Sequence, residues 1–358
     1  MRIGILGGGQ LGRMLALAGY PLGLSFRFFD PSDTACAGQV GPLFVGRYQE
    51  EALLRFAEGL DLLTYEFENV PVEPVQALKG LPIHPPLKAL EIAQDRLLEK
   101  RFFQSLGVPT PAFHPVEGLE DLRAGLARVG LPAFLKTRRG GYDGKGQALV
   151  RTEKEAEEAL FALGGKGLIL EALVPFDREV SLIAVRGKDG GLAFYPLVEN
   201  RHQGGILRQS LAPAPTPPGL QAKAEAYLEQ ALLALDYVGV LTVEFFQVKG
   251  ELLFNEMAPR VHNSGHWTIE GAETSQFENH LRAILGLPLG STRPRGYSAM
   301  LNLIGKRPDF ARVLKVPGAH FHWYGKEVEP GRKVGHITLL AQSEAEREEG
   351  LKALEGLV

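Results

Sequence analysis

Residues 136–147 read Lys-Thr-Arg-Arg-Gly-Gly-Tyr-Asp-Gly-Lys-Gly-Gln and connect two short apolar runs. The stretch is not a Walker A loop, because Gly140 and Gly144 are separated by one residue too few and Lys145 is followed by glycine. A plain hairpin does not need so much glycine. A flap that lays backbone N–H groups and Lys136 over phosphates explains the composition better, although a long solvent loop stays open as the alternative.

A second stretch, Val238–Met257, reads as a β-hairpin with its turn near Gly250. A hairpin that is symmetric about this glycine places Glu244 directly opposite Glu256, while Asn255 points to the other face of an ideal strand. Opposed like charges are destabilising unless a cation lies between them, and carboxylates are the hard oxygen ligands that Mg²⁺ prefers. A one-residue slip would separate the pair. Together, the flap and the hairpin predict ATP and Mg²⁺ bound between two β structures.

The chain opens with a different glycine motif. Gly7–Gly12 (GGGQLG) follows a predicted strand and begins a predicted helix, so it fits G-x-G-x-x-G, and Asp30 closes the next strand. This pattern is typical of a Rossmann dehydrogenase, whose loop holds an anion at a helix N-terminus. Any phosphate satisfies the same geometry, and no hydride-transfer site follows. An NAD-dependent oxidoreductase and a tight turn without a ligand both stay open as alternatives.

Three regions with different patterns divide the chain. Residues 1–95 alternate strands and helices, which predicts a Rossmann-like parallel sheet. Residues 96–290 are rich in hairpins and contain the flap, near 138–147, so they predict an α+β domain. Residues 291–358 predict a small β-rich cap closed by one helix.

Individual elements follow from hydrophobic periodicity and turn residues. One helix is expected over Ala89–Leu106, because Gly107 and Pro109 lie just beyond it. The other helices that we predict are Leu11–Ala18, Glu50–Ala57, Glu153–Leu163, Glu344–Leu354 and one that follows the proline-rich loop Leu211–Gly219 and runs through Leu235. The predicted strands are Arg2–Leu6, Ser25–Phe29, Leu60–Tyr65, Ala133–Thr137, Gln147–Val150, Leu168–Leu173, Glu179–Val185 and Leu192–Leu197.

Composition narrows the class of protein. With 358 residues, of which 45% are hydrophobic and 23% charged, the chain has the balance of a globular protein with a sizeable core. Its net charge of -3 gives no reason to expect nucleic acid or an anionic membrane surface as a partner. Cys36 is the only cysteine, which excludes an intrachain disulfide and a Cys-based zinc site. The apolar stretch Met14–Phe26 falls short of the about 20 residues that a bilayer needs, so we expect a cytoplasmic protein.

The motifs resemble those of the ATP-grasp superfamily and, within it, the 5-(carboxyamino)imidazole ribonucleotide synthetase family, the ATPase subunit of phosphoribosylaminoimidazole carboxylase. This resemblance implies an α/β and α+β fold with an N-terminal Rossmann-like parallel sheet, an ATP-grasp domain and a small C-terminal β-rich cap. The last two of its motifs are the specific ones. The motifs are GGGQLGRM (Gly7–Met14), QDR (Gln94–Arg96), GYDGKGQ (Gly141–Gln147), HQGGIL (His202–Leu207), NEMAPRVHNSGHWT (Asn255–Thr268) and YGKEVEPGRKVGH (Tyr324–His336).

The resemblance implies an ATP site under the flap. Glu179 would bind the ribose hydroxyls, and Glu244 and Glu256 would bind Mg²⁺, with Mn²⁺ as an alternative. His202 matches a nucleotide-contacting position, although a hydrogen-bonded loop histidine stays open. The implied ATP-binding residues are Arg96 and Lys136 at the phosphates, Gly141, Tyr142, Asp143, Gly144, Lys145, Gly146 and Gln147 in the flap, Glu171, Ala172, Leu173 and Val174 at the adenine, and Glu179, His202, Asn255 and Glu256.

A ribonucleotide site is implied between the first glycine loop and the cap. Three cations around Pro330-Gly331 suit an anion, although charge runs often only face solvent. Glu66 competes for its role with Glu68, two residues further on the same strand face. The implied contacts are Gln10, Leu11, Glu66, Arg260, His262, Asn263, Ser264, Lys326, Arg332 and Lys333.

The implied activity is that of an ADP-forming carbon–nitrogen ligase that carboxylates 5-aminoimidazole ribonucleotide in purine biosynthesis. Bicarbonate would attack the γ-phosphorus of ATP, and the amine of the ribonucleotide would then capture carboxyphosphate or its CO₂. Asp143, Lys326 and Tyr142 match positions that hold bicarbonate or handle the amine proton. Closure of the flap would keep water from carboxyphosphate. The resemblance also implies a homodimer.

Rival functions within and outside the superfamily remain. A formate-dependent glycinamide ribonucleotide transformylase has a similar layout, and only the His262–Trp267 run favours the carboxylating family. Biotin carboxylase would be longer. A non-catalytic nucleotide-binding module is disfavoured because Lys136, Asp143, Glu244 and Glu256 are all present.

Overall fold

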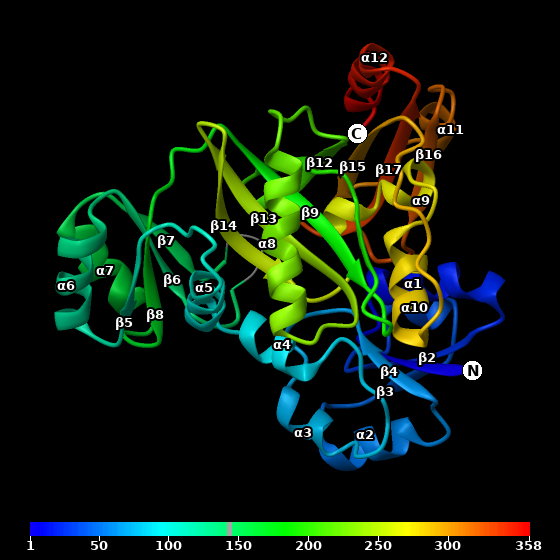
Figure 1. The fold of residues 1–358 in the computed structure, drawn as a ribbon, viewed down its shortest axis with the longest axis horizontal. Helices are drawn as coiled ribbons and strands as arrows, with labels where there is room; N and C mark the ends of the chain where they lie inside the picture. The colour runs from blue at the N-terminus through cyan, green and yellow to red at the C-terminus, as the bar shows by residue number, and fades with distance from the viewer. Residues whose placement is uncertain (142–144) are drawn as a thin grey trace.

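The computed structural model of the protein describes residues 1–141 and 145–358. These residues form three β-sheets with helices packed against them (Figure 1). Figure 1 shows the N-terminal sheet at the lower right, a small sheet with two helices at the far left, and a long sheet running between them and up to the C-terminus. The predicted mixture of α/β and α+β segments is confirmed.

The N-terminal sheet is parallel, with strand order β3-β2-β1-β4. Its central strands β1 and β2 can be buried on both faces because they are nearly continuous apolar runs. Ile3 and Ile5 of β1 and Phe28 and Phe29 of β2 are fully buried. The predicted strand–helix alternation is therefore correct. The elements are β1 (Arg2–Leu6), α1 (Gln10–Gly19), β2 (Ser25–Asp30), β3 (Leu43–Val45), α2 (Glu50–Ala57), β4 (Leu62–Tyr65), α3 (Val72–Gln76) and the 3₁₀ turns η1 (Tyr20–Leu22) and η2 (Cys36–Gln39).

A small antiparallel sheet of order β5-β8-β6-β7 forms a separate lobe. Two helices pack against each other and cover it, burying Leu135, Leu160 and Leu170. The glycine stretch connects β6 to β7, and Lys136 pairs with Gln147 at its base. The elements are β5 (Phe113–Val116), α6 (Leu119–Val129), β6 (Ala133–Thr137), β7 (Gln147–Val150), α7 (Glu153–Ala162) and β8 (Leu168–Ala172).

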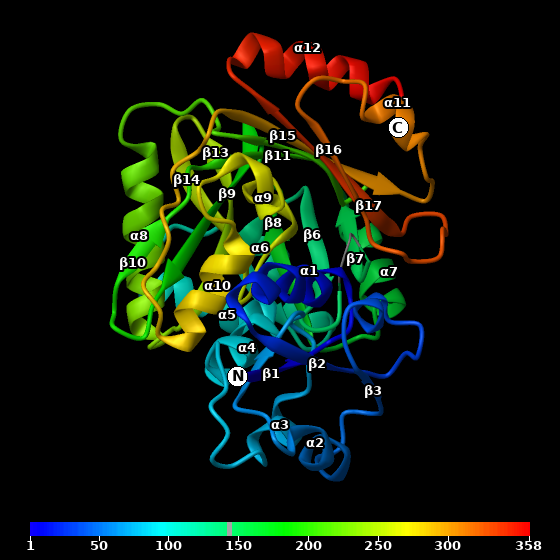
Figure 2. The same cartoon turned by 90° about the vertical axis from the view of Figure 1, so that its right-hand side faces the viewer.

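The long sheet runs in the order β14-β13-β9-β11-β12-β15-β17-β16, with β10 paired to β9. The C-terminal β-rich segment continues this sheet, because β15 pairs with β12. Figure 2 shows its strands β15, β16 and β17 together below α12. The elements are β9 (Arg178–Arg186), β10 (Leu192–Phe194), β11 (Val198–Gln203), β12 (Ile206–Ala212), α8 (Leu220–Ala234), β13 (Gly239–Val248), β14 (Glu251–Ala258), η3 (Asn263–Gly265), α9 (Thr268–Gly271), α10 (Gln276–Leu285), β15 (Tyr297–Ile304), α11 (Phe310–Val313), β16 (Ala319–Trp323), β17 (Lys333–Ala341) and α12 (Glu344–Glu355).

The helix predicted over Ala89–Leu106 is in fact two helices, α4 (Leu87–Ala93) and α5 (Arg96–Ser105). Asp95 separates them as the N-cap of α5, where its carboxylate accepts the Leu97 N–H (3.0 Å) and pairs with Arg138 (2.7 Å). The break could not be predicted from periodicity, because Arg138 comes from the distant β6 end. In the part of the chain that the structure describes, no helix is both long and apolar enough to cross a membrane.

The β13–β14 hairpin does place Glu244 opposite Glu256, but not through symmetry about Gly250. Lys249 and Gly250, both at positive φ (49° and 82°), form a two-residue turn that pairs Val248 with Glu251. That register alone would leave Glu244 opposite Asn255. A β-bulge beyond Phe245 adds one residue on β14 and restores the Glu244–Glu256 pair.

The turn generates a stability prediction. Lys249 has a Cβ at positive φ, which costs about 1 kcal/mol or more, whereas Asn tolerates this conformation well. We expect Lys249→Asn to raise the midpoint of thermal unfolding by about 1–2 °C and Gly250→Ala to lower it. Calorimetry of both variants checks this, and a lower midpoint for Lys249→Asn would contradict the turn geometry.

Candidate functional site

A cleft lies where the small lobe, α5, the β13–β14 hairpin and the N-terminal sheet meet. Its lining includes predicted residues from four separate segments of the chain. These are Arg96, Gly141, Glu244, Glu256, Arg260 and His262. The tertiary structure therefore brings the predicted phosphate, metal and ribonucleotide residues to one place.

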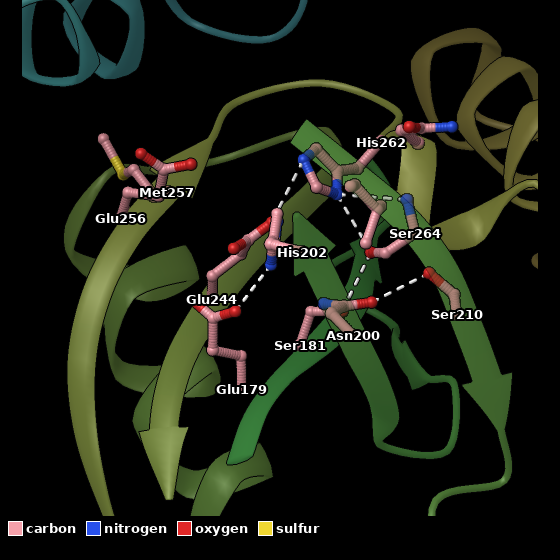
Figure 3. Close-up of polar contacts among 12 residues, drawn as sticks. Glu179, Ser181, Asn200, His202, Ser210, Glu244, Glu256, Met257, His262 and Ser264 are labelled. Atoms are coloured by element: carbon pink, nitrogen blue, oxygen red, sulfur yellow. Dashed lines mark hydrogen bonds and ion pairs between the residues drawn. The ribbon is translucent and has the colours of Figure 1, made fainter. Parts of the chain in front are cut away.

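The Glu244–Glu256 pair is suited to a divalent cation (Figure 3). Glu244 is 6% exposed; burial, and then the charge of Glu256, raise its pKa to about 8. Arg96, at the start of α5, lies 3.7 Å from Glu256 and offsets part of the negative charge. A carboxylate that resists ionisation without a cation is the behaviour expected of a metal ligand. Glu244 and Glu256 therefore fit Mg²⁺, whose remaining ligands would be water and phosphate oxygens.

His202 lies on the same side of the sheet as this pair (Figure 3). Its Nδ1 is 2.6 Å from Oε2 of Glu179 on β9. Burial opposes a charge on the ring, but the hydrogen bond to Glu179 and the charge of Glu244 outweigh it, so the pKa of His202 is raised. His202 thus comes from β11, a strand, and lies between carboxylates of β9 and β13 that favour its protonated form.

His262 lies next to Glu244. Its Nε2 is 3.5 Å from Oε1 of Glu244, but burial, and then the charge of Arg260, hold the pKa of His262 well below its usual value. The contact is therefore made by a neutral ring. Ser264 lies behind it, fully buried, with its hydroxyl 2.9 Å from Nδ1 of His262 and 2.8 Å from the hydroxyl of Ser181. Ser264 therefore contacts His262, which lines the cleft, but does not line the cleft itself.

Arg260 joins the cleft to the N-terminal sheet. Its guanidinium binds Oε2 of Glu68 through Nε (2.6 Å) and Nη2 (2.5 Å), and Glu68 lines the cleft. Asn263, in η3, instead pairs with Asn302 of β15 through two amide hydrogen bonds of 3.0 and 2.7 Å. These contacts fix the Arg260–Ser264 segment between the N-terminal and C-terminal strands.

Lys136 and Glu171 face each other in the small lobe. The Lys136 ammonium donates to Oε2 of Glu171 at 2.8 Å, while Oε1 of Glu171 is buried and has no hydrogen-bond partner in the described structure. Buried acceptors of this kind are usually satisfied by a donor, here one that a ligand or water would bring.

The backbone N–H groups of the first glycine motif donate hydrogen bonds to carboxylates of the same chain. Glu66 accepts the N–H groups of Gly9 (2.5 Å) and Gly12 (2.7 Å), and Asp30 accepts that of Gly8 (2.8 Å). A Cβ on Gly9 would lie 2.5 Å from the Glu66 carboxylate, so the glycines are needed for this approach. The N–H groups that bind pyrophosphate in a dinucleotide site are thus taken, which removes the main support for NAD.

The cap contacts the same loop through Lys326. Its ammonium donates to Oε1 of Gln10 (3.2 Å), and Gln39 binds the carbonyl of the preceding Gly325 (2.9 Å). Burial lowers the pKa of Lys326 below its usual value. Arg332, in the turn before β17, is paired with Glu329 at 3.3 Å. Lys326 is thus held over the glycine loop.

Some predicted residues lie elsewhere or were missed. Tyr142, Asp143 and Gly144 lie outside the described residues, and the side chain of Leu11 packs in the core. Sequence reasoning missed Lys100, a buried lysine on α5 that contacts Glu171. Adjacent acidic and basic residues on a helix normally indicate a solvated face, so the sequence carried no signal for its burial.

Family models match three successive parts of the chain. The ribonucleotide synthetase preATP-grasp domain matches residues 1–94, the ATP-grasp domain residues 101–277, and the phosphoribosylaminoimidazole carboxylase C-terminal domain residues 298–350. N5-carboxyaminoimidazole ribonucleotide synthase from Pseudomonas aeruginosa is 53% identical over 360 residues, covering 100% of this chain and 99% of the relative.

Solved structures agree with these matches. N5-carboxyaminoimidazole ribonucleotide synthetase from Thermus thermophilus superimposes with a TM-score of 0.97 at 75% identity, over 99% of this chain and 98% of that one. N5-carboxyaminoimidazole synthase from Aspergillus clavatus, in complex with ADP and 5-aminoimidazole ribonucleotide, gives a TM-score of 0.92 at 32% identity, over 99% and 97% of the two chains.

The opposed carboxylates generate a metal-binding prediction. We expect Glu244→Gln and Glu256→Gln each to weaken Mn²⁺ binding about tenfold or more. Because burial and the charge of Glu256 already disfavour ionised Glu244, the neutral Glu244→Gln side chain should not lower the thermal midpoint of the metal-free protein. Titration calorimetry with Mn²⁺ and thermal unfolding measure both effects. Glu251→Gln, an exposed glutamate on the same hairpin, is the matched control and should bind Mn²⁺ as the wild type does.

Proposed function

The chain belongs to the N5-carboxyaminoimidazole ribonucleotide synthase family of ATP-grasp ligases, and on that premise we propose how its residues share the reaction. It is an ADP-forming ligase that uses ATP to carboxylate 5-aminoimidazole ribonucleotide in purine biosynthesis. The observation that carries the assignment of residues is the single cleft in which Arg96, Glu244 and Glu256 meet Arg260 and His262.

ATP would lie between the small lobe and the long sheet. Arg96 and Lys136 would contact its phosphates, and the 141–147 segment would close over them. Glu171, whose Oε1 lacks a partner in the described structure, would accept a hydrogen bond from the adenine amine, and Glu179 would bind the ribose hydroxyls. Mg²⁺ held by Glu244 and Glu256 would offset charge on the transferring phosphoryl group.

The ribonucleotide would lie on the Arg260 side of the cleft, beneath the cap. Arg332 and Lys333 suit its phosphate, and Gln10 and Lys326 would face its imidazole. Glu66 has two of its lone pairs engaged by the glycine loop, so any contact with the ribonucleotide would use the others. Glu68 already lines the cleft and is the stronger candidate of the two.

The chemical sequence that we propose has two steps. An oxygen of bicarbonate attacks the γ-phosphorus, ADP leaves, and carboxyphosphate forms. The exocyclic amine then bonds to the carbon of carboxyphosphate, or of the CO₂ it releases; phosphate leaves and the amine gives up one proton. Asp143 is the proposed acceptor of that proton, and Lys326 and Tyr142 would hold the bicarbonate-derived oxygens. A dry, closed site would protect carboxyphosphate from water.

Bicarbonate as substrate, a homodimer and a cytoplasmic location are also proposals. The division at 1–95, 96–290 and 291–358 is another, supported by the separate matches of three family models. Light scattering tests the dimer, which would have twice the 39.0 kDa mass of the chain.

Release of ADP tests the reaction directly. Mg²⁺–ATP and bicarbonate are supplied with 5-aminoimidazole ribonucleotide, and in parallel glycinamide ribonucleotide is supplied with formate. We expect turnover only in the first mixture, and ¹⁸O from labelled bicarbonate should appear in phosphate. Turnover with formate would move the function to the transformylase. No ADP in either mixture, with NADH fluorescence enhanced by the protein, would favour the oxidoreductase.

Lys326 gives a further prediction. We expect Lys326→Ala to lower kcat by about 10²- to 10⁴-fold, because the bicarbonate-derived oxygens lose their cation, while the KM for ATP changes little. Steady-state kinetics measure both constants. Lys315→Ala, an exposed lysine of the same C-terminal segment, is the matched control. A loss confined to the KM for ATP would place Lys326 in the nucleotide site instead.

A further inference from the structure

Lys100 is a buried lysine for which the proposed reaction has no role. It lies on α5 with only 2% of its surface exposed. Its ammonium donates to the carbonyl of Asn255 (3.1 Å) and lies 3.5 Å from Oε2 of Glu171. Lysine is rarely buried unless it is paired, so these neighbours indicate what its charge does.

Glu171 is in contact with two lysines. Oε2 of Glu171 accepts the hydrogen bond of Lys136 at 2.8 Å and faces Lys100 at 3.5 Å. Lys136 comes from β6 of the small lobe, whereas Lys100 comes from α5, which packs against β14 of the long sheet. The carboxylate therefore has one close cation on the lobe that carries the flap and one slightly farther cation on the opposite side.

Lys136 cannot serve Glu171 and the nucleotide phosphates fully at the same time. If the ammonium of Lys136 turns to the phosphates, Glu171 loses its nearest cation. Glu171 is only 4% exposed, so water cannot replace that cation. A buried carboxylate left without a close cation is strongly disfavoured, which would weaken nucleotide binding. Lys100, only 3.5 Å away, is placed to take over the pairing with a small movement.

We propose that Lys100 is a positioning residue for ATP: it keeps Glu171 paired when Lys136 turns to the phosphates, and so makes Lys136 available to the nucleotide. This inference rests on the proposed contact between Lys136 and the phosphates of ATP. Lys100 itself touches neither nucleotide nor metal in this arrangement.

The electrostatics of Glu171 agree with a shared counter-ion. Burial alone would raise its pKa, but the charges of Lys100 and then Lys136 lower it to about 2. Glu171 therefore stays ionised at neutral pH and needs a cation in every state of the site. Without Lys100, Lys136 is its only close cation in the described structure and is held more tightly away from the phosphates.

A second role for Lys100 must be separated from this one. Its hydrogen bond to Asn255, together with that of Glu99 to the N–H of Met257 (2.6 Å), supports β14 on both sides of Glu256. Loss of that support would disturb the metal ligand whether or not residue 171 is charged. The proposal therefore differs in one respect: the loss of Lys100 should weaken nucleotide binding much more when residue 171 is Glu than when it is Gln.

A double-mutant cycle on nucleotide binding tests the proposal. Calorimetry with Mg²⁺–ADP and with AMP-PNP is run on the wild type, Lys100→Met, Glu171→Gln and the double variant. We expect Lys100→Met to raise the Kd about tenfold or more when residue 171 is Glu, and less than about threefold when it is Gln. Lys154→Met, an exposed lysine on α7, is the control and should bind as the wild type does.

Equal losses in both backgrounds would overturn the proposal and leave Lys100 with a structural or long-range charge effect. An unchanged Kd for Lys100→Met would overturn it as well. Lys100→Gln keeps a donor for Asn255 and replaces Lys100→Met in the cycle if the latter does not fold, as circular dichroism would reveal. Lys136→Met separates the two proposals: if it leaves the Kd unchanged, the phosphate role of Lys136 is wrong, whatever the cycle shows.

Discussion

The like charges of Glu244 and Glu256, held opposite each other on adjacent strands, are the constraint on which the site depends. Two carboxylates in this position are favoured once a cation joins them, and burial, then the charge of Glu256, raise the pKa of Glu244. The bulge on β14 lies at the point where the turn alone would have misaligned the pair. Arg96 supplies positive charge next to Glu256, and His202 lies on the other side, bound to Glu179.

Helix α5 connects this pair to the small lobe. Arg96 in its first turn faces Glu256, while Glu99 and Lys100, one turn on, bind the free edge of β14 and Glu171 of β8. Because β14 is the edge strand of the long sheet, its outward N–H and C=O groups need partners, and side chains of α5 provide them. One helix thus connects the proposed metal ligands, Glu244 and Glu256, to the small lobe.

The N-terminal glycine loop has the G-x-G-x-x-G pattern of a dinucleotide site, but its N–H groups bind carboxylates of this chain. Its N–H groups still bind negative charge at the start of a helix, but the charges are those of Glu66 and Asp30. A loop fixed in this way holds Gln10 toward Lys326 of the cap. The motif therefore forms one wall of the region where we propose that the ribonucleotide binds.

Local patterns were sufficient for much of this protein. Apolar alternation located most strands and helices, and the motifs of the flap, the hairpin and the cap identified the family, because these features depend on residues close in sequence. The bulge at Asn255, the capture of the glycine loop by Glu66 and the burial of Lys100 could not be predicted in the same way. The last two depend on partners far away in the chain, such as Glu171 for Lys100, whereas the break at Asp95 had a local signal, the N-cap residue itself, that the periodicity did not show. Sequence by itself determined many of the elements and the chemistry they carry, although it missed α6, α10, β11, β12 and the C-terminal strands β15, β16 and β17. Only the tertiary structure decided how the charges pair, because pairing energies arise from burial and distance that no local pattern contains.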